Sequence, residues 1–488
     1  MGSDADLDDA CDALGRALER GACSPRNDDV AIAVIGRIEV YLQSSDTPRG
    51  DRPSKRLGED SCRALGRLYR QLGSTSTDRH LLLRRLAEQD SPEALSVFVE
   101  AICSDPPLDA EHAALAMVPL FARERRHTAS LFPRLLDALE HASIAPLILD
   151  LANFLVREGG QNEHPAAGRS AALATLLGEM TQRLEKLNES PETVGAAQRN
   201  KMVADAVALM ISLCDALALI GDRSVVGKLF QALELSHRRI RTEAAAALAR
   251  LGEDEGLKVL VEMAEQPLVR NRALAYLEEL GETDRVDEEQ RSPQARAESD
   301  LVCWLAEPAQ FGTPPQSLEL FDSARQYWPG FDEPVDCFLF RYAYVLAAGE
   351  LSAIGMAGPL VHSFSTDLQD MPPADIYAAF AGWQAEHEEV YEVQIEQLGP
   401  SDTAQLQRVR GELQHQDFDD VEFVSVGHFF GQTMTVATAT RAGQSGTVIY
   451  QTDRISWCPQ GNPQSPVDAS LAYNIHKGRI LLRTFNPQ

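Results

Sequence analysis

The chain has 488 residues, of which 44% are hydrophobic, and a formal net charge of −28 at pH 7. This length exceeds that of one ordinary domain. The excess of acidic residues argues against binding to nucleic acid, which needs Lys and Arg to neutralise phosphates, and against docking on an anionic membrane. The same charge favours solubility and a protein partner.

The N-terminal region of the chain carries no targeting signal that we can identify. Its first residues are acidic and lack the apolar core of a signal peptide, and no run approaches the roughly 18 uninterrupted apolar residues of a membrane span. The eight cysteines are scattered without a Cys-x-x-Cys pair, which is typical of reduced thiols in a cytoplasm. We therefore expect a cytoplasmic protein. Residues 1–60 are expected to form helices and a mobile loop that cap the next domain.

From residue 61 to residue 281 the sequence predicts helices throughout. The clearest signal is a pattern that occurs twice, because Ile240–Gly252 aligns without a gap with Val269–Gly281. Apolar residues in the first copy recur at Ile240, Ala244, Ala247, Leu248 and Leu251. This spacing places one apolar stripe on a helix, and Ala245 lies off that stripe. Gly252 and Gly281 stand where a helix ends on a residue that tolerates positive φ.

These two segments resemble HEAT repeats, in particular the short type of the phycobilisome lyases, and the resemblance is clearest over residues 205–281. It rests on the Val/Ile-Arg start, the Ala-rich helix and the closing Leu-Gly. The resemblance implies an all-α solenoid of stacked helix pairs, which we assign to residues 61–281. It also implies that Arg241 and Arg270, the structural arginines of the repeat, mostly face neighbouring helices.

The composition changes after the repeats. Residues 282–299 are charged and nearly devoid of large apolar residues, so we expect an interdomain linker there. All four tryptophans lie beyond residue 300, together with several strand-like runs. Residues 300–488 are therefore expected to form an aromatic-rich α+β domain with an antiparallel sheet and a helix over Pro373–Gln397. This domain resembles no family known to us.

The chain lacks the sequence motifs of serine hydrolases, P-loop NTPases, zinc proteases and dinucleotide-binding proteins. The cluster around His387 is the strongest candidate for chemistry, but on a helix His387 has no usual metal ligand three or four positions away. We predict no catalytic, cofactor or metal site. An enzyme with its active site in the C-terminal domain is the alternative. Its candidate residues are His362, Trp383, Glu386, His387 and His428.

Basic residues in the repeats form the second group of candidates. Arg238, Arg239 and Arg272 add local positive charge to a strongly acidic chain, and such a surface attracts acidic segments of a partner through bidentate contacts. Bonds within the array are the competing explanation for these arginines. We predict a non-enzymatic protein–protein interaction scaffold that binds neither nucleic acid nor membrane. A bilin-lyase-like protein is a further alternative, because bilin lyases share the repeat type.

Overall fold

The computed structural model describes residues 29, 32–36, 38 and 57–485, apart from short gaps. The gaps are 73–75, 77, 123–125, 159–160, 190–195, 347–348, 365–367, 385–389, 394–399, 430–431, 452–453, 460–472 and 478–479. Most of residues 1–60, where we expect the cap, therefore lies outside the described residues. The chain divides into two compact units, Met1–Met263 with Glu279–Gly281, and Ala264–Glu278 with Glu282–Gln488.

The first unit consists of helices wherever it is described. Its α-helices are α3 (Glu59–Leu72), α4 (His80–Glu88), α5 (Pro92–Ser104), α6 (Ala110–Met117), α7 (Ala145–Arg157), α8 (Ser170–Glu189), α9 (Ala196–Ile220), α10 (Val226–Leu233), α11 (Arg238–Arg250) and α12 (Asp254–Ala264). Short 3-10 helices join them: η1 (Val118–Phe121), η2 (Thr128–Leu131), η3 (Arg134–Glu140), η4 (Ala167–Arg169) and η6 (Arg223–Val225).

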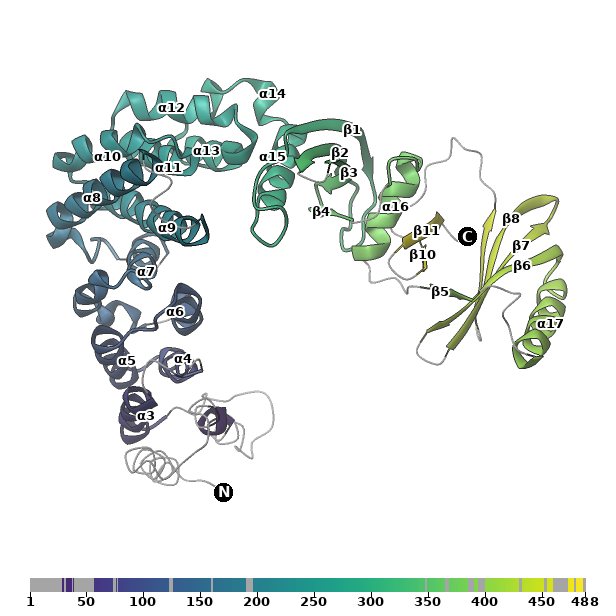
Figure 1. The fold of residues 1–488 in the computed structure, drawn as a ribbon, viewed down its shortest axis with the longest axis horizontal. Coiled ribbons are helices and arrows are strands. Elements are labelled where there is room, and N and C mark those ends of the chain that lie inside the picture. The colour runs from purple at the N-terminus through teal and green to yellow at the C-terminus, as the bar shows by residue number, and fades with distance from the viewer. Residues whose placement is uncertain are drawn as a thin grey trace. The chain divides into compact units, whose positions relative to one another are not determined.

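These helices form two layers in which each helix contacts its neighbours along the chain. In one layer α3 packs on α5, and α8 packs on α10. In the other layer α4, α6, α7, α9 and α11 follow one another, each in contact with the next. Contacts between the layers join α3 to α4 and α10 to α11 (Figure 1). Such nearest-neighbour packing defines an α-solenoid and confirms the predicted architecture.

The predicted ends of the repeat helices are confirmed, but the predicted apolar stripe of α11 is too narrow. Gly252 and Gly281 have φ angles of 84° and 73°, as a helix-terminating glycine requires. Ala245 has an exposed fraction of 0%, although it lies off the stripe. A Cβ on Gly256 of α12 would lie 2.4 Å from the Ala245 carbonyl oxygen, so α12 approaches α11 backbone to backbone. The Ala-rich face of α11 is therefore a second buried face.

A chain of opposite charges links successive helices of one layer. Arg157 of α7 pairs with Asp215 of α9. Asp215 also accepts from Arg250 at the end of α11 at 3.3 Å, and Arg250 contacts Glu279 at 2.6 Å. Arg250 is mostly buried, so its two carboxylate partners compensate a cation that is largely withdrawn from water. This charge ladder, formed by Arg157, Asp215, Arg250 and Glu279, fixes the stacking of the helices at one end of the layer.

One segment among the described residues is long and apolar enough to cross a membrane. It is Gln198–Ile220 of α9, whose mean hydropathy is 2.1 and half of which is buried. In the structure α9 packs against α7, α8 and α11, and it carries Asp215 of the charge ladder. The helix is thus a core element of the array.

The second unit begins with the last helices of the chain's helical region, and here the predicted linker over 282–299 is wrong. After α13 (Pro267–Leu280) the chain forms η7 (Thr283–Arg285), α14 (Glu288–Arg291) and α15 (Pro293–Leu305). Arg270 of α13 is only 4% exposed and donates to the carbonyl oxygens of Ala264 and Ala295 and to Glu298. The charged residues of α15 therefore serve as bonding partners for α13 and keep this segment folded.

The α+β region contains a four-stranded antiparallel sheet in the order β1-β2-β3-β4. Its strands are β1 (Ser317–Gln326), β2 (Val335–Leu346), β3 (Gly349–Ala357) and β4 (His362–Ser363). One face packs on α15, where Leu301 lies so close to Gly355 that a Cβ there would be 2.9 Å from the leucine methyl groups. The other face packs on α16 (Pro373–Gln384) through a core that includes Phe380.

The second sheet has the order β11-β10-β5-β6-β7-β8-β9. Its strands are β5 (Val390–Val393), β6 (Phe418–Phe429), β7 (Gln432–Arg441), β8 (Gln444–Gln451), β9 (Arg454–Pro459), β10 (Tyr473–Lys477) and β11 (Ile480–Phe485). Strands β6 to β9 form the expected antiparallel meander, and α17 (Pro400–Gln414) packs on it through Leu413. The predicted helix over Pro373–Gln397 is wrong at β5, because β-branched and aromatic residues favour a strand there.

Candidate functional site

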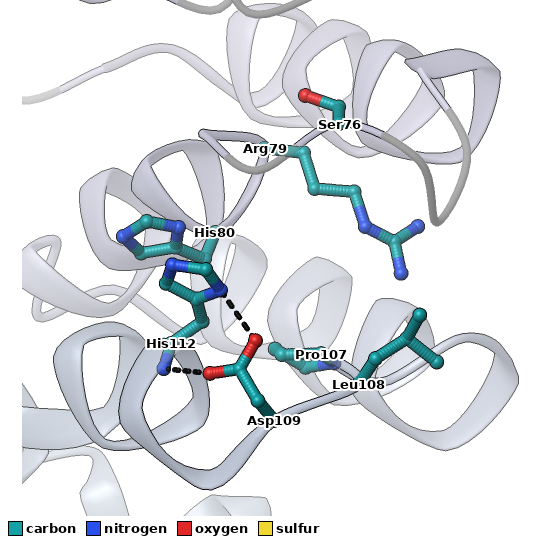
Figure 2. Close-up of a pocket in the computed structure, with 7 residues that line it drawn as sticks. All are labelled: Ser76, Arg79, His80, Pro107, Leu108, Asp109 and His112. Atoms are coloured by element: carbon teal, nitrogen blue, oxygen red, sulfur yellow. Dashed lines mark hydrogen bonds and ion pairs between the residues drawn. The ribbon is translucent and has the colours of Figure 1, made fainter.

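A small pocket lies between the N-terminal ends of α4 and α6 in the first unit. Its volume is about 80 Å³. The residues that line it are Ser76, Arg79, His80, Pro107, Leu108, Asp109 and His112. Figure 2 shows the imidazoles of His80 and His112 lying face to face, with the Asp109 carboxylate beside His112. The ring centroids are 4.2 Å apart and the planes differ by 17°.

Asp109 holds His112 in place from the start of α6. As the N-cap residue, its Oδ1 accepts from the His112 backbone N–H at 2.8 Å. Its Oδ2 lies 2.7 Å from Nδ1 of the His112 ring. Burial raises the pKa of Asp109, but its bonds to His112 outweigh that effect, so the pKa is lowered overall. The carboxylate is therefore ionised, and the Nδ1 proton of His112 faces it.

Arg79 fixes the opposite wall of the pocket. It is buried, pairs with Asp105, and donates through Nη2 to the carbonyl oxygen of Pro106 at 3.3 Å. Its guanidinium also lies 4.6 Å from the ring centroid of Tyr69, whose hydroxyl donates to the Asp105 carbonyl oxygen. Burial is the main reason that the pKa of Tyr69 is raised. These bonds tie the loop before α6 to α3, so the pocket is rigid on this side.

The size and chemistry of the pocket limit what it can hold. A volume of about 80 Å³ takes a few water-sized groups or the end of one side chain, whereas sites for cofactors are several times larger. Among the described residues no group of three or more His, Cys, Asp and Glu side chains is arranged to hold a metal ion. This pocket was not among the sites predicted from the sequence. Its local signal was the Asp109-x-x-His112 start of α6, but the pairing with His80 depends on the packing of two helices.

The predicted basic residues fall into two groups. Arg238 and Arg239 are exposed in the first turn of α11, and neither forms an ion pair with another described residue. Arg272, in the second unit, is also exposed, and its guanidinium lies 4.7 Å from the ring centroid of Tyr276. Arg270 is a structural arginine, as the repeat pattern predicts.

The alternative site in the C-terminal domain is described only in part. The ring of His362 on β4 stacks on Trp383 of α16, with centroids 3.9 Å apart and planes 11° apart. Burial lowers the pKa of His362, so its imidazole is neutral at neutral pH. Glu386 and His387 lie outside the described residues. His428 belongs to β6, opposite Thr433 in the register, and the structure does not describe its side chain.

The fold defines a helical repeat protein with a C-terminal α+β region. The family model for HEAT repeats matches residues 205–286, so this segment consists of HEAT repeats. HEAT repeats in general mediate protein–protein interactions. The pocket of Figure 2 lies before the matched segment, in helices that continue the same packing. No curated protein and no solved structure matches the chain.

Proposed function

We propose that the protein is a non-enzymatic, cytoplasmic interaction scaffold, and that Arg238 and Arg239 dock an acidic segment of a protein partner. The observation that carries the proposal is the placement of these two arginines. They lie in the first turn of α11, where the helix dipole disfavours positive charge. The unfavourable interaction of these exposed positive charges with the helix dipole is offset when an anionic group binds there.

Three other arginines of the first unit make the contrast. Arg157, Arg223 and Arg250 form ion pairs with carboxylates of neighbouring helices or connections. The position before α11 adds a second argument, because His237 provides no side-chain cap and its Nδ1 is buried without a hydrogen-bond partner among the described residues. Burial, followed by the charge of Arg239, lowers the pKa of His237. The first turn of α11 thus offers free N–H groups and two guanidinium groups to an anion.

The overall charge supports a specific rather than a diffuse docking surface. With a net charge of −28, an acidic partner is repelled by most of the surface and attracted to a local basic patch. The same charge is the reason that we propose neither nucleic acid nor an anionic membrane as the partner. Arg272 belongs to the proposed partner-binding residues as well, with its exposed guanidinium beside Tyr276.

Quantitative affinity capture from the native host tests the proposal. The double variant Arg238→Glu/Arg239→Glu should lose the partners that the wild-type chain captures, and wild-type capture should weaken as salt rises. The matched control is Arg183→Glu/Lys186→Glu, which changes the charge equally on exposed residues of α8. Both variants should melt close to the wild type, since exposed charges contribute only about 0–1 kcal/mol. Equal capture by the α11 variant and the wild type would place the surface elsewhere.

A further inference from the structure

We propose that the exposed faces of α6 and α7 bind an amphipathic helix of a protein partner, and that basic residues flank the apolar stripe of that helix. The apolar residues of this surface, here called the apolar strip, are Leu115, Val118, Phe121, Leu147 and Phe154. The carboxylates Glu111 and Asp150 lie on the same two helices. The surface is separate from Arg238 and Arg239, so the two docking sites can be tested independently.

Exposed apolar side chains of the first unit gather at α6. Among its described residues the exposed large apolar side chains are those of Ile32, Leu108, Leu115 and Val118, and three of these four lie in α6 or close beside it. Val118 follows the last residue of α6 with φ −44° and ψ −42°, so the helical turn continues into η1. Glu111, Leu115 and Val118 are thus spaced four and three residues apart on one exposed face.

A contact between two rings extends the strip from α6 to α7. Phe121, at the end of η1, packs on Phe154 of α7 with ring centroids 5.6 Å apart. On α7 itself Leu147, Asp150 and Phe154 are only partly buried, and their spacing of three and four residues places them on one face. Figure 1 shows α6 and α7 as neighbours in one layer. The two helices therefore present a continuous apolar surface.

The backbone of α6 and α7 decides which form of partner segment fits. The N–H and C=O groups of a helix are bonded within the helix, so the strip offers contacts with side chains only. An extended segment that docked here would leave some of its own backbone groups unpaired against apolar side chains, which is unfavourable. A helix satisfies its backbone internally. Its apolar side chains recur every three and four residues, as do those of α6 and α7.

The charges on the two helices decide the sign of the partner. Apart from His112, whose ring lines the pocket of Figure 2, the ionisable residues of α6 and α7 are Glu111, Asp150 and Arg157. Arg157 is already bound by Asp215 of α9. The two carboxylates therefore give the strip a negative field, which attracts basic side chains.

The helix on the other side of α6 does not oppose this field. The arginines of α4 are Arg84 and Arg85, and Glu88 of the same helix pairs with both. The sign of the local field is also that of the whole chain, whose net charge is −28. A basic partner helix is thus attracted at long range as well as at the strip.

Asp150 provides an independent argument for a bound cation. Burial raises the pKa of Asp150 despite a hydrogen bond with Ser212, and the charges of Asp215 and Glu243 act in the same direction as burial. The ionised carboxylate therefore destabilises the protein on its own. A Lys or Arg side chain of the partner would compensate this charge, which gives the acidic residue a role at the edge of the strip.

The test uses synthetic peptides and the full-length protein. The basic probe is a helical peptide of about five turns with leucines at positions i, i+3, i+4 and i+7 and with Lys and Arg on both flanks. A second peptide has the same stripe with Glu on the flanks, and a third has the composition of the basic probe without the stripe. Fluorescence anisotropy should show saturable binding of the basic probe that weakens as salt rises. The acidic peptide should bind about tenfold more weakly.

Two variants with matched controls connect this binding to the strip. Val118→Ser removes apolar contact area and should weaken binding of the basic probe about tenfold. Its control is Val345→Ser on β2, because that valine is 71% exposed against 59% for Val118. Asp150→Asn should weaken binding about fivefold, whereas Asp254→Asn, at an exposed position of α12, should leave it unchanged. Since Asp150→Asn is also expected to raise Tm, its weaker binding could not result from unfolding.

Four results would overturn the proposal. Two of them are the absence of saturable binding by the basic probe and equal binding of the basic and acidic peptides. Self-association of the protein that Val118→Ser abolishes, measured by sedimentation, would assign the strip to a second copy of the chain. Adsorption to phosphatidylcholine vesicles that the same substitution abolishes would assign it to a lipid surface.

Discussion

Arg250 reaches from the last turn of α11 to Asp215 of α9, with 3.3 Å between Nη1 and Oδ1, and binds Glu279 with the same guanidinium. Arg157 of α7 pairs with the same Oδ1 of Asp215. Arginines at the two ends of one repeat helix therefore differ in their surroundings. The difference between Arg250 and Arg238 is that Arg250 is largely buried and paired, whereas Arg238 is exposed at the positive end of its helix.

The close packing of α12 on α11 predicts opposite effects for two glycine substitutions. Gly256→Ala should destabilise the protein although alanine is the better helix former, because its Cβ would lie 2.4 Å from the Ala245 carbonyl oxygen and 2.5 Å from the Ala249 nitrogen. Gly227→Ala on α10 is the control, since its Cβ would meet no atom within 4 Å. This variant should gain about 0.4–1 kcal/mol. Urea unfolding measures both, and a stabilised Gly256→Ala would show that the helices can separate at little cost.

Asp150 on α7 predicts an unusual dependence of stability on pH. Burial, together with the charges of Asp215 and Glu243, raises its pKa despite a hydrogen bond with Ser212. A carboxyl with a raised pKa in the folded state destabilises the protein above that pKa, and the penalty disappears as the pH falls below the unfolded value of about 3.9. Asp150→Asn should therefore raise Tm at pH 7, and the gain should shrink on acidification.

The control for this effect is Asp222, whose pKa is lowered by hydrogen bonds from Ser170 and then Ser224. Its contribution to stability is present above the unfolded pKa and is lost as the pH falls through the folded value. Asp222→Asn should thus lower Tm at pH 7. Calorimetry at several pH values tests the pair. A lower Tm of Asp150→Asn at pH 7 would mean that the bond with Ser212 outweighs burial.

The sequence predicts much of this fold and little of its polar chemistry. The recurring Arg-Ala-Leu-Gly pattern is enough to predict the repeat helices and their glycine ends, because both depend on local spacing. The buried state of Ala245 could not be predicted from one helix, since it results from the approach of Gly256 on another. The stack of His80 on His112 likewise depends on the register of two helices.

The predicted linker shows a second limit of predictions that rest on the composition of a segment. A segment rich in charge is typical of a solvated connection, but here the charged residues are partners of a buried arginine. Arg270 bonds Glu298 at 2.6 Å, and Asn271 donates to Asp300 at the same distance. The sequence alone does not tell whether a charge faces water or another charge.

Removal of Arg270 is expected to release this segment. Arg270→Ala leaves three carbonyl oxygens and the half-buried Glu298 without their donor, which should cost on the order of 3 kcal/mol. Limited proteolysis should then cleave within 282–299, where the wild-type chain resists. The control is Arg272→Ala, which removes an exposed guanidinium and should leave the cleavage pattern unchanged. Rapid cleavage of the wild-type chain at these residues would contradict the folded connection.

Hydrogen–deuterium exchange of the protein alone and with a captured partner tests the central claim most directly. The scaffold account predicts that the partner slows exchange in peptides that cover the first turn of α11, from His237 to Arg241, because its anionic groups bind the free N–H groups there. The exchange of α8 peptides around Arg183 should not change. Protection confined to the C-terminal α+β region, with unchanged exchange at α11, would contradict the account.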